Sequence, residues 1–447
     1  MTLRFGTDGV RGVANRDLTP ELVTALGRAA ARVIGNDRPF LVGRDTRRSG
    51  PMIEAALIAG LCAEGADVER AGVIPTPGLA YLAQERDAPA AMISASHNPF
   101  PDNGVKLFAA GGRKIPDDAE RQVEDELREL AKKAPTGGPD GAGVGWDRKL
   151  GGAFGEYLAH LVGALEGRRL EGLRIVVDCG HGAAFEIAPT VLEKVGAAVE
   201  VLNARPNGTN INEGCGSTDP SGLQAAVVDG GAKCGLAFDG DADRVIAVDE
   251  HGDLVDGDQM LAVLALDLRE RGRLRGDAVV GTVMSNLGLR RALEDHGIRY
   301  VETPVGDRSV LAALEAEELS LGGEQSGHVI LTDLATTGDG TLTGLLLLDV
   351  MARRGKALSE IAGVVTRLPQ VLRSVEVADR AGLGRNQSFR AELDAAKAEL
   401  GDDGRVVVRP SGTEPVVRVM VEAGSEEQAE AVASRLATAV ERACGVA

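Results

Sequence analysis

The chain has 447 residues, of which 44% are hydrophobic and 26% charged, and its formal net charge at pH 7 is −18. This length exceeds what one hydrophobic core supports, so we expect several domains. The acidic balance argues against nucleic acid or an anionic membrane as a partner, because both bind basic surfaces. An anionic substrate would need a site that is locally basic.

The five cysteines form no C-x-x-C pair and stand mostly in apolar or glycine-rich segments. This usage is typical of buried thiols in a reducing compartment. The N-terminal residues include no apolar signal segment, and no apolar stretch approaches the roughly 20 residues that span a bilayer. We therefore expect a cytoplasmic protein that does not associate with membranes.

Three segments repeat the order of a β-rich run, a polar loop, a helix and a second β-rich run: residues 39–72, 174–202 and 277–304. Such βαβ units form mixed, mostly parallel sheets whose ligand loops follow the strands. Residues 405–424 alternate as two strands around a turn, and an amphipathic helix follows over 425–444. This tail predicts a small α+β domain with an antiparallel sheet.

Changes in composition predict the domain boundaries. A charged helix over residues 117–133 and a Gly/Pro-rich stretch precede Trp146, and further breaks fall near "DEHGD" and "RLPQV". We expect an α/β protein in which three related βαβ-based domains and the C-terminal α+β domain surround a central cleft. The expected domains are residues 1–148, 149–250, 251–367 and 368–447.

The stretch "AAMISASHNPFPDNGVKLF" leads from an apolar strand into Ser94, Ser96, His97 and Asn98, and Lys106 follows a Pro-Asp-Asn-Gly turn. Hydroxyl groups on a loop at a strand end suit phosphate binding or nucleophilic catalysis, whereas a capped turn is the purely structural alternative. No G-x-S-x-G elbow of a hydrolase occurs here. Local chemistry does not choose between the two serines.

Asp239, Asp241 and Asp243 stand between the apolar runs "CGLAF" and "VIAV". The D-x-D-x-D pattern resembles an EF-hand loop, but Arg244 occupies the position where that loop needs glycine. Three carboxylates this close repel one another, so a cation is expected among them; a solvated turn is the alternative. The apolar flanks place the turn at a sheet end, which favours Mg²⁺ with a phosphate opposite.

Two later loops also carry polar groups. "GGEQSGHVI" offers a weak signal for sugar binding through Glu324, Ser326 and His328. The turn "RPSGTEP" suits an anion, because glycine exposes backbone N–H groups and arginine supplies charge, although a plain hairpin explains it equally well. Its polar residues are Arg409, Ser411, Gly412 and Thr413.

The N-terminal segments "RFGTDGVRG" and "GRDTRRSG" add arginines near strand ends, and each is equally well explained as an exposed loop residue. They are Arg11, Arg44, Arg47 and Arg48. No G-x-x-x-x-G-K-[ST] loop is present, which argues against a P-loop kinase. The six histidines form no H-E-x-x-H motif or cluster, which disfavours zinc-dependent hydrolysis.

The motifs "SASHNP", "DGDADR", "GEQSGH" and "RPSGTEP", in this order and spacing, resemble those of the α-D-phosphohexomutases over essentially the whole chain. The N-terminal "FGTDGVRG", Gln325 and "TTGDG" are similar to the branch of that family that acts on glucosamine phosphates. Relatives that act on glucose or mannose phosphates usually carry methionine in place of Gln325.

The resemblance implies a central cleft to which each of the four domains contributes one loop, with Ser96 carrying a phosphoryl group. It implies one Mg²⁺ ion held by Asp239, Asp241, Asp243 and the phosphorylated Ser96. The implied acid–base and cleft residues are Lys106, His328, Arg11 and Arg244. The implied substrate-binding residues are His97, Glu324, Ser326, Arg409, Ser411, Gly412, Thr413 and Arg418.

For activity, the resemblance implies interconversion of glucosamine 6-phosphate and glucosamine 1-phosphate, which supplies UDP-N-acetylglucosamine for cell-wall synthesis. Glucosamine 1,6-bisphosphate would be the intermediate and activator. The alternatives are a phosphomannomutase or phosphoglucomutase of the same family, a sugar phosphatase that uses the same phosphoserine, and a non-catalytic binding protein. We expect a small phosphosugar as the only partner of a monomer or homodimer.

The chain departs from the family pattern at five positions outside the four chemical loops. These are Gly180, His181, Asp219, Ser221 and Ser309. They leave contacts of the second domain and the discrimination between sugars open, but not the reaction class.

Overall fold

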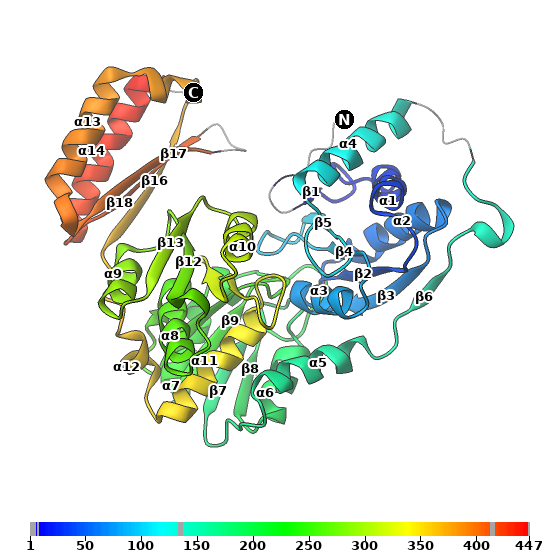
Figure 1. Cartoon of the computed structure of the whole chain (residues 1–447), viewed down its shortest axis with the longest axis horizontal. Coiled ribbons are helices and arrows are strands. Elements are labelled where there is room, and N and C mark those ends of the chain that lie inside the picture. Colours follow the sequence, from blue (N-terminus) through cyan, green and yellow to red (C-terminus); the bar gives the residue numbers. More distant parts are fainter. Residues whose placement is uncertain (1–5, 7–8, 133–136, 412–415, 446–447) are drawn as a thin grey trace.

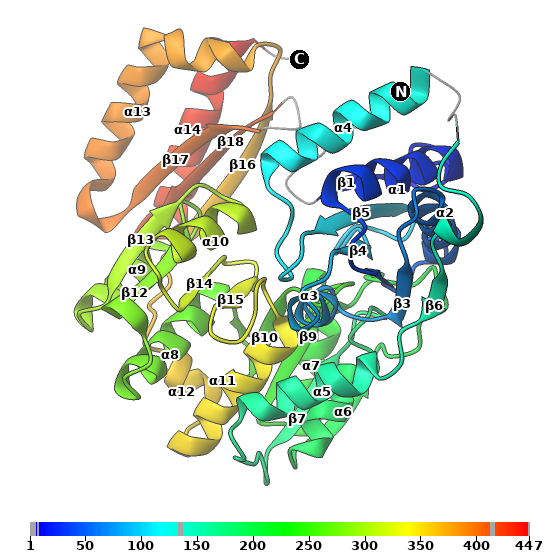
Figure 2. The same cartoon turned by 45° about the vertical axis from the view of Figure 1, so that its right-hand side comes forward.

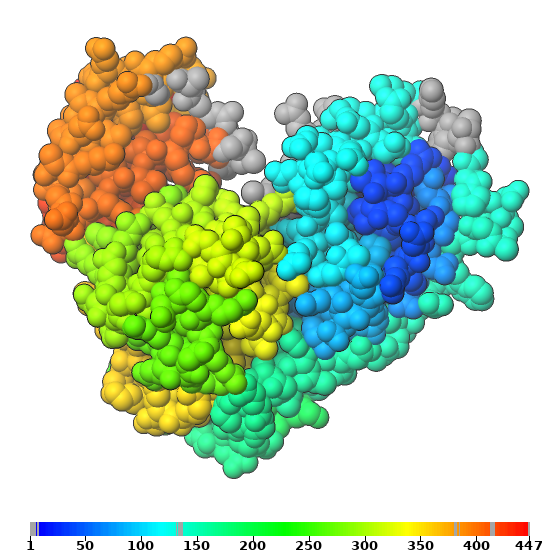
Figure 3. Space-filling view, viewed as in Figure 1, coloured from blue at the N-terminus to red at the C-terminus, as the bar shows by residue number. Residues whose placement is uncertain are grey.

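The computed structural model describes residues 6, 9–132, 137–411 and 416–445, and that part of the chain contains four sheets, one in each successive domain (Figure 1). The predicted α/β fold with a C-terminal α+β domain is confirmed. The exact boundaries after residues 148, 250 and 367 stay predictions. In the space-filling view, domains 1 and 4 rise on either side of domain 3 and leave a hollow between them (Figure 3).

Domain 1 is built on a six-stranded sheet in the order β1-β5-β4-β2-β3-β6. Strands β4, β2, β3 and β6 are parallel, whereas β5 runs antiparallel to β1 and β4. Alternate residues of β2 serve opposite faces: Phe40 and Val42 pack in the cluster under α1 and α2, and Leu41 packs in the cluster under α3. The elements are β1 (Val10–Val13), α1 (Pro20–Ile34), β2 (Phe40–Arg44), α2 (Gly50–Ala63), β3 (Val68–Val73), α3 (Thr76–Glu85), β4 (Ala90–Ile93), β5 (Asp102–Phe108), α4 (Asp117–Lys132) and β6 (Asp147–Lys149).

Domain 2 has a five-stranded sheet in the order β11-β10-β9-β7-β8. The predicted βαβ unit over residues 174–202 forms β7, α6 and β8, and β7 is parallel to both β8 and β9. Strand β10 returns antiparallel to β9, so the turn between Phe238 and Val245 lies at the carboxyl end of β9. The elements are α5 (Ala153–Ala164), β7 (Arg174–Asp178), α6 (Ile187–Lys194), β8 (Ala198–Leu202), α7 (Ser221–Gly230), β9 (Cys234–Phe238), β10 (Val245–Asp249) and β11 (Leu254–Val255).

Domain 3 has a four-stranded sheet in the order β13-β12-β14-β15 and shares a hydrophobic core with domain 2. Leu236 of β9, Leu261 of α8 and Leu345 of α11 belong to one buried cluster. This shared core fixes the loops of the two domains relative to each other. The elements are α8 (Gly257–Glu270), β12 (Ala278–Thr282), α9 (Leu287–Asp295), β13 (Arg299–Thr303), α10 (Asp307–Ala316), β14 (Leu321–Gly323), β15 (Val329–Leu331), α11 (Gly340–Arg354) and α12 (Leu358–Ala362).

Domain 4 is a three-stranded antiparallel sheet, β16-β18-β17, with its own core. Val417, Val419 and Val421 alternate along β18 and are buried with Val432 and Leu436 of α14, as the two-residue period of a strand requires. The elements are β16 (Gln370–Glu376), α13 (Gln387–Leu400), β17 (Arg405–Pro410), β18 (Val416–Glu422) and α14 (Glu426–Cys444).

Short 3₁₀ helices complete the described segments. They are η1 (Gly141–Gly143), η2 (Gly216–Thr218), η3 (Arg275–Asp277), η4 (Arg380–Arg385) and η5 (Gly401–Asp403). Within the residues that the structure describes, no helix has the length and apolar character needed to cross a membrane.

One glycine allows a loop of domain 3 to pack closely against a strand of domain 2. Gly327, in the loop between β14 and β15, has φ +88°, and a Cβ atom there would lie 1.8 Å from the carbonyl oxygen of Val245 in β10. The loop therefore lies directly against the end of β10.

We predict that Gly327→Ala lowers the melting temperature more than Gly355→Ala does. Gly355 also has positive φ (+62°), but a Cβ atom there meets nothing within 4 Å. Both variants carry a left-handed penalty of about 1–2 kcal/mol, and Gly327→Ala adds a packing penalty of about 1–3 kcal/mol. Thermal unfolding followed by circular dichroism measures the difference; equal melting temperatures would contradict the close contact.

Candidate active site

The loop after β4 presents the hydroxyl group of Ser96, and not that of Ser94, to the aspartate turn. Ser94 Oγ donates to Asp45 Oδ2 at 2.7 Å and accepts from the backbone N–H of Ser96 at 2.9 Å. Ser96 has φ +52°, and its Oγ donates to Asp239 Oδ2 at 2.6 Å. The two serines that local sequence could not separate therefore have different surroundings in the structure.

The turn between β9 and β10 brings three carboxylates together. Asp239, Asp241 and Asp243 each place one oxygen within 4.8 Å of the others, and all three side chains are buried. The apolar strands on both sides anchor this turn in the sheet. The turn is thus a buried cluster and not a solvated loop.

The ionisation of each carboxyl group in this cluster depends on the charged groups around it. Burial raises the pKa of Asp239 well above its ordinary value, and the carboxylates of Asp243 and Asp241 raise it further. Burial also opposes ionisation of Asp243, but the Lys106 ammonium and then His328 outweigh it and hold the pKa of Asp243 well below its ordinary value. The buried cluster therefore disfavours three negative charges at once, and Asp239, beside Ser96 Oγ, is the carboxyl group that resists ionisation.

Besides Ser96, domain 1 contributes two further groups that contact the aspartate turn. Lys106 Nζ lies 2.7 Å from Asp241 Oδ2 and 3.3 Å from Asp243 Oδ2. Thr76, at the start of α3, donates from Oγ1 to Asp241 Oδ2 at 2.6 Å. Figure 2 shows α3 close to the ends of β9 and β10. Sequence reasoning named Lys106 but missed Thr76, which stands in an ordinary helix start.

The aspartate cluster fits a divalent cation. Asp241 Oδ1 and Asp243 Oδ1 are buried and make no hydrogen bond to any described residue. Buried carboxylate oxygens without partners are costly unless a cation binds them. Oxygen ligands are those that Mg²⁺ prefers. Asp239, Asp241 and Asp243 are therefore the residues that would hold it.

The loop between β14 and β15 lies on the other side of this cluster. Glu324 Oε1 accepts from the backbone N–H of Gly306 at 3.0 Å, and the Ser326 hydroxyl is buried without a hydrogen-bond partner among the described residues. His328 Nδ1 lies 3.8 Å from Asp243 Oδ2, and although burial lowers the pKa of His328, Asp243 raises it above the ordinary value. A cavity of about 140 Å³ is lined by Asp243, Arg244, Val305, Gly306, Asp307, Glu324 and His328.

Gln325, which the sequence associates with the choice of sugar, points toward α8. Its Nε2 donates to Asp256 Oδ2 at 3.3 Å, and Asp256 is the N-cap of α8. Gln325 does not line the 140 Å³ cavity. It holds the loop on which Glu324 and Ser326 stand.

Three further expected residues surround Ser96. Burial lowers the pKa of His97, and the guanidinium groups of Arg244 and Arg11 lower it further, which places three basic side chains near one another. His97 Nδ1 lies 3.4 Å from Ser96 Oγ. Arg244 donates its backbone N–H to Asp239 Oδ1 at 3.2 Å. This part of the acidic protein is locally basic, as an anionic substrate requires.

Domain 4 brings two arginines together on neighbouring strands. Arg409 of β17 is paired in register with Arg418 of β18, and Ser411 is buried at the end of β17. Burial lowers the pKa of Arg409, and Arg418 lowers it further. Paired guanidinium groups of this kind suit a phosphate. Gly412 and Thr413 lie outside the described residues.

Comparison with known proteins identifies the class. Four family models match the chain. They are the phosphoglucomutase/phosphomannomutase α/β/α domains I (residues 2–134), II (155–252) and III (256–368) and the C-terminal domain (360–439). The chain belongs to the phosphoglucomutase/phosphomannomutase family, which confirms the resemblance seen in its four motifs.

Comparison with individual relatives indicates which member of the family this chain resembles. It is 54% identical to the phosphoglucosamine mutase of Salinispora arenicola, over 99% of both chains, and 53% identical to that of Streptomyces griseus, again over 99% of both. A phosphoglucomutase/phosphomannomutase family protein from Burkholderia thailandensis has a TM-score of 0.83 at 26% identity, covering 98% of this chain and 97% of that one. The N-acetylphosphoglucosamine mutase of Aspergillus fumigatus, in complex with GlcNAc-6P and magnesium, shares the fold with a TM-score of 0.70 at 20% identity, covering 99% and 96%.

We predict that Asp241→Asn weakens Mg²⁺ binding by more than about 100-fold, beyond the 10–100-fold typical of residues that only support a ligand. Isothermal titration with Mg²⁺ measures the affinity. Asp249→Asn is the matched control, because Asp249 is a buried carboxylate at the end of β10 that accepts backbone N–H groups away from the turn. Unchanged Mg²⁺ affinity in Asp241→Asn would contradict the assignment.

Proposed function

We propose that the chain interconverts glucosamine 6-phosphate and glucosamine 1-phosphate, with Ser96 as the residue that carries the phosphoryl group. Family membership and relatives at 54% identity support the mutase and the amino sugar. The observation on which the mechanism rests is the 2.6 Å contact from the hydroxyl of Ser96 to Asp239, at the edge of three buried carboxylates. The product would enter cell-wall precursor synthesis, so the enzyme would act in the cytoplasm.

In the first half of the proposed reaction, the free hydroxyl oxygen of the sugar attacks the phosphorus of phospho-Ser96. The bond between Ser96 Oγ and phosphorus breaks as the new bond to the sugar oxygen forms. The sugar hydroxyl loses its proton to a base, and Ser96 Oγ gains a proton as it leaves, so the step is balanced. Lys106 and His328 are the candidates for these acid–base roles, and general acid–base catalysis of this kind contributes about 10²–10⁴-fold. The result is glucosamine 1,6-bisphosphate and free Ser96.

In the second half, the bisphosphate turns over in the cleft and returns its other phosphoryl group to Ser96. The phosphate that is not transferred must be held in both orientations by one anchor. Arg409, Ser411 and Arg418 would supply that anchor with Gly412 and Thr413, and His97, Glu324 and Ser326 would contact the sugar or its phosphate.

Charge neutralisation is the main requirement of phosphoryl transfer. A Mg²⁺ ion bound by Asp239, Asp241, Asp243 and the phosphoserine would supply Lewis-acid shielding. Arg11 and Arg244 lower the pKa of His97, whose Nδ1 lies 3.4 Å from Ser96 Oγ, and this supports a role for their positive charges near the phosphoryl group. Their guanidinium groups would bind the phosphoryl oxygens and exclude water from them.

The relatives favour the mutase over the phosphatase and over glucose- or mannose-specific enzymes. Incubation with glucosamine 1-phosphate separates the first two: a mutase yields the 6-isomer with little inorganic phosphate. Matched assays with glucosamine, glucose and mannose 1-phosphates, each primed with its own bisphosphate, test the sugar. The state of assembly, monomer or homodimer, stays a prediction.

We predict that Ser96→Ala abolishes isomerisation and leaves Mg²⁺ affinity within about threefold of that of the unphosphorylated wild type, because the three carboxylates remain. Product formation from glucosamine 1-phosphate and Mg²⁺ titration are the two measurements. Isomerisation at the wild-type rate would remove Ser96 from the mechanism.

We predict that Arg409→Gln raises KM for glucosamine 1-phosphate by about 10- to 100-fold, since a hydrogen bond to a charged group contributes about 1.5–3 kcal/mol. Arg435→Gln is the control: Arg435 pairs with Glu392 and Glu399 on the helices of the same domain. Steady-state kinetics of both variants measure KM. An unchanged KM in Arg409→Gln would exclude it from the phosphate anchor.

A further inference from the structure

A buried arginine, Arg47, binds the backbone of the loop that contains Ser96. Arg47 follows β2 and is 1% exposed. Its Nη2 donates to the carbonyl oxygens of Ser96 and Asn98, both at 2.8 Å. Its Nη1 donates to those of Pro99 at 2.5 Å and Asp102 at 3.0 Å. One guanidinium group therefore holds four carbonyl groups of the loop.

Asp45 fixes the orientation of this guanidinium. Its Oδ2 accepts from Arg47 Nε at 2.9 Å and from Ser94 Oγ at 2.7 Å, while its Oδ1 accepts from the backbone N–H of Arg47 at 2.9 Å. All five N–H donors of an arginine side chain are thus used. Lysine, with three donors and no planar fork, has no equivalent geometry.

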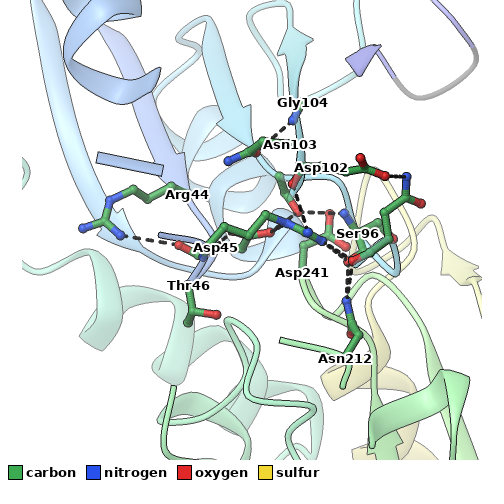
Figure 4. A network of polar contacts seen from close by, with 12 residues as sticks. Arg44, Asp45, Thr46, Ser96, Asp102, Asn103, Gly104, Asn212 and Asp241 are labelled. Atoms are coloured by element: carbon green, nitrogen blue, oxygen red, sulfur yellow. Dashed lines mark hydrogen bonds and ion pairs between the residues drawn. The ribbon is translucent and has the colours of Figure 1, made fainter. Parts of the chain in front are cut away.

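Domain 2 holds the same loop from the opposite side. Asn212 Nδ2 donates to the carbonyl oxygen of Ser96 at 2.9 Å and to that of Asn98 at 3.2 Å. Each of these carbonyls therefore accepts from both Arg47 and Asn212. Figure 4 shows Asn212 reaching Ser96 from the domain 2 side and Asp45 within the domain 1 network.

This double contact bears on the conformation of Ser96. A left-handed φ of +52° is unfavourable for serine and persists only where surrounding contacts fix it. The N–H of Ser96 is fixed by Ser94 Oγ, and its carbonyl by Arg47 and Asn212. That conformation directs Oγ to Asp239.

We propose that Arg47 and Asn212 are positioning residues for phosphoryl transfer: together they grip the Ser96 carbonyl and keep the phosphoryl-bearing oxygen aimed at the aspartate turn. This inference rests on the proposed function, since it takes Ser96 as the carrier. The donors of Arg47 are all used on Asp45 and the loop, so its effect reaches the reaction only through the placement of Ser96.

The test compares full-length wild type, Arg47→Lys, Asn212→Ala and a control, Arg28→Lys. Arg28 is a largely buried arginine of the same domain that pairs with Glu64, away from the Ser96 loop. Each protein is assayed for kcat and KM with glucosamine 1-phosphate, for Mg²⁺ affinity, for melting temperature, and for phosphate uptake by Ser96 from glucosamine 1,6-bisphosphate.

We expect Arg47→Lys to lower kcat and the rate of Ser96 phosphorylation by about 100-fold, the cost of a misplacement of about 1 Å. Asn212→Ala should lower both by about 10-fold, because one donor remains on each carbonyl. KM and the Mg²⁺ affinity of the unphosphorylated proteins should stay within about threefold of wild type, since the side chains that contact the substrate and the three aspartates are unchanged. Arg28→Lys should keep the wild-type kcat.

Wild-type kcat in a folded Arg47→Lys protein would overturn the proposal. So would a parallel change of kcat, KM and Mg²⁺ affinity, which indicates a general structural role. If Arg47→Lys does not fold, Asn212→Ala tests the proposal instead, because this substitution leaves no buried charge without a partner. A tenfold lower kcat in Asn212→Ala supports the proposal, and an unchanged kcat overturns it. A wild type that neither isomerises the sugar nor takes phosphate on Ser96 would refute the proposed function instead.

Discussion

The crowding of Asp239, Asp241 and Asp243 beside Ser96 is the constraint on which the rest of the site depends. Three buried carboxylates within 4.8 Å of one another repel strongly where water is excluded. Lys106 offsets part of this charge, and Asp241 Oδ1 and Asp243 Oδ1, which accept no hydrogen bond from the described residues, are available to a divalent cation. A phosphoryl group on Ser96 would add nearly two negative charges. A cation, the carboxylates and a phosphoserine would therefore stabilise one another in this site.

The architecture separates Ser96 and the aspartate turn from the arginine pair of domain 4, the proposed phosphate anchor. Domains 2 and 3 share one core, so the aspartate turn and the loop of Glu324 keep a fixed relation. Domain 1 is tied to this block through Thr76 and Asn212, which cross between domains 1 and 2. Domain 4 has its own core and meets domain 3 through side chains such as Glu422, which accepts from the N–H of Leu287. A separately folded anchor suits a reaction in which the intermediate must turn over without escaping.

Sequence reasoning predicted the parts that depend on local pattern. The three βαβ units, the C-terminal hairpin and the aspartate turn at a strand end all follow from apolar periodicity, and the structure contains each. The contacts of Thr76 and Asn212 escaped it, because they join residues far apart in the chain that carry no local motif; Asn212 and Ser96 are 116 positions apart. Sequence reasoning named Arg47 only as an arginine near a strand end, without its contacts to the Ser96 loop. Sequence reasoning associated Gln325 with the glucosamine branch, yet its amide donates to Asp256 and it does not line the 140 Å³ cavity. The roles of the site residues stay predictions.

The most direct test of the central claim follows one phosphate. Enzyme phosphorylated with isotopically labelled phosphate is mixed with unlabelled glucosamine 6-phosphate for a single turnover, and the label is located by mass spectrometry of the peptide that contains Ser96 and of the sugar. The account predicts that the label leaves the Ser96 peptide, enters the sugar phosphate pool and is replaced on the peptide by unlabelled phosphate. Label that stays on Ser96 while isomer forms, or that appears as inorganic phosphate, would contradict it.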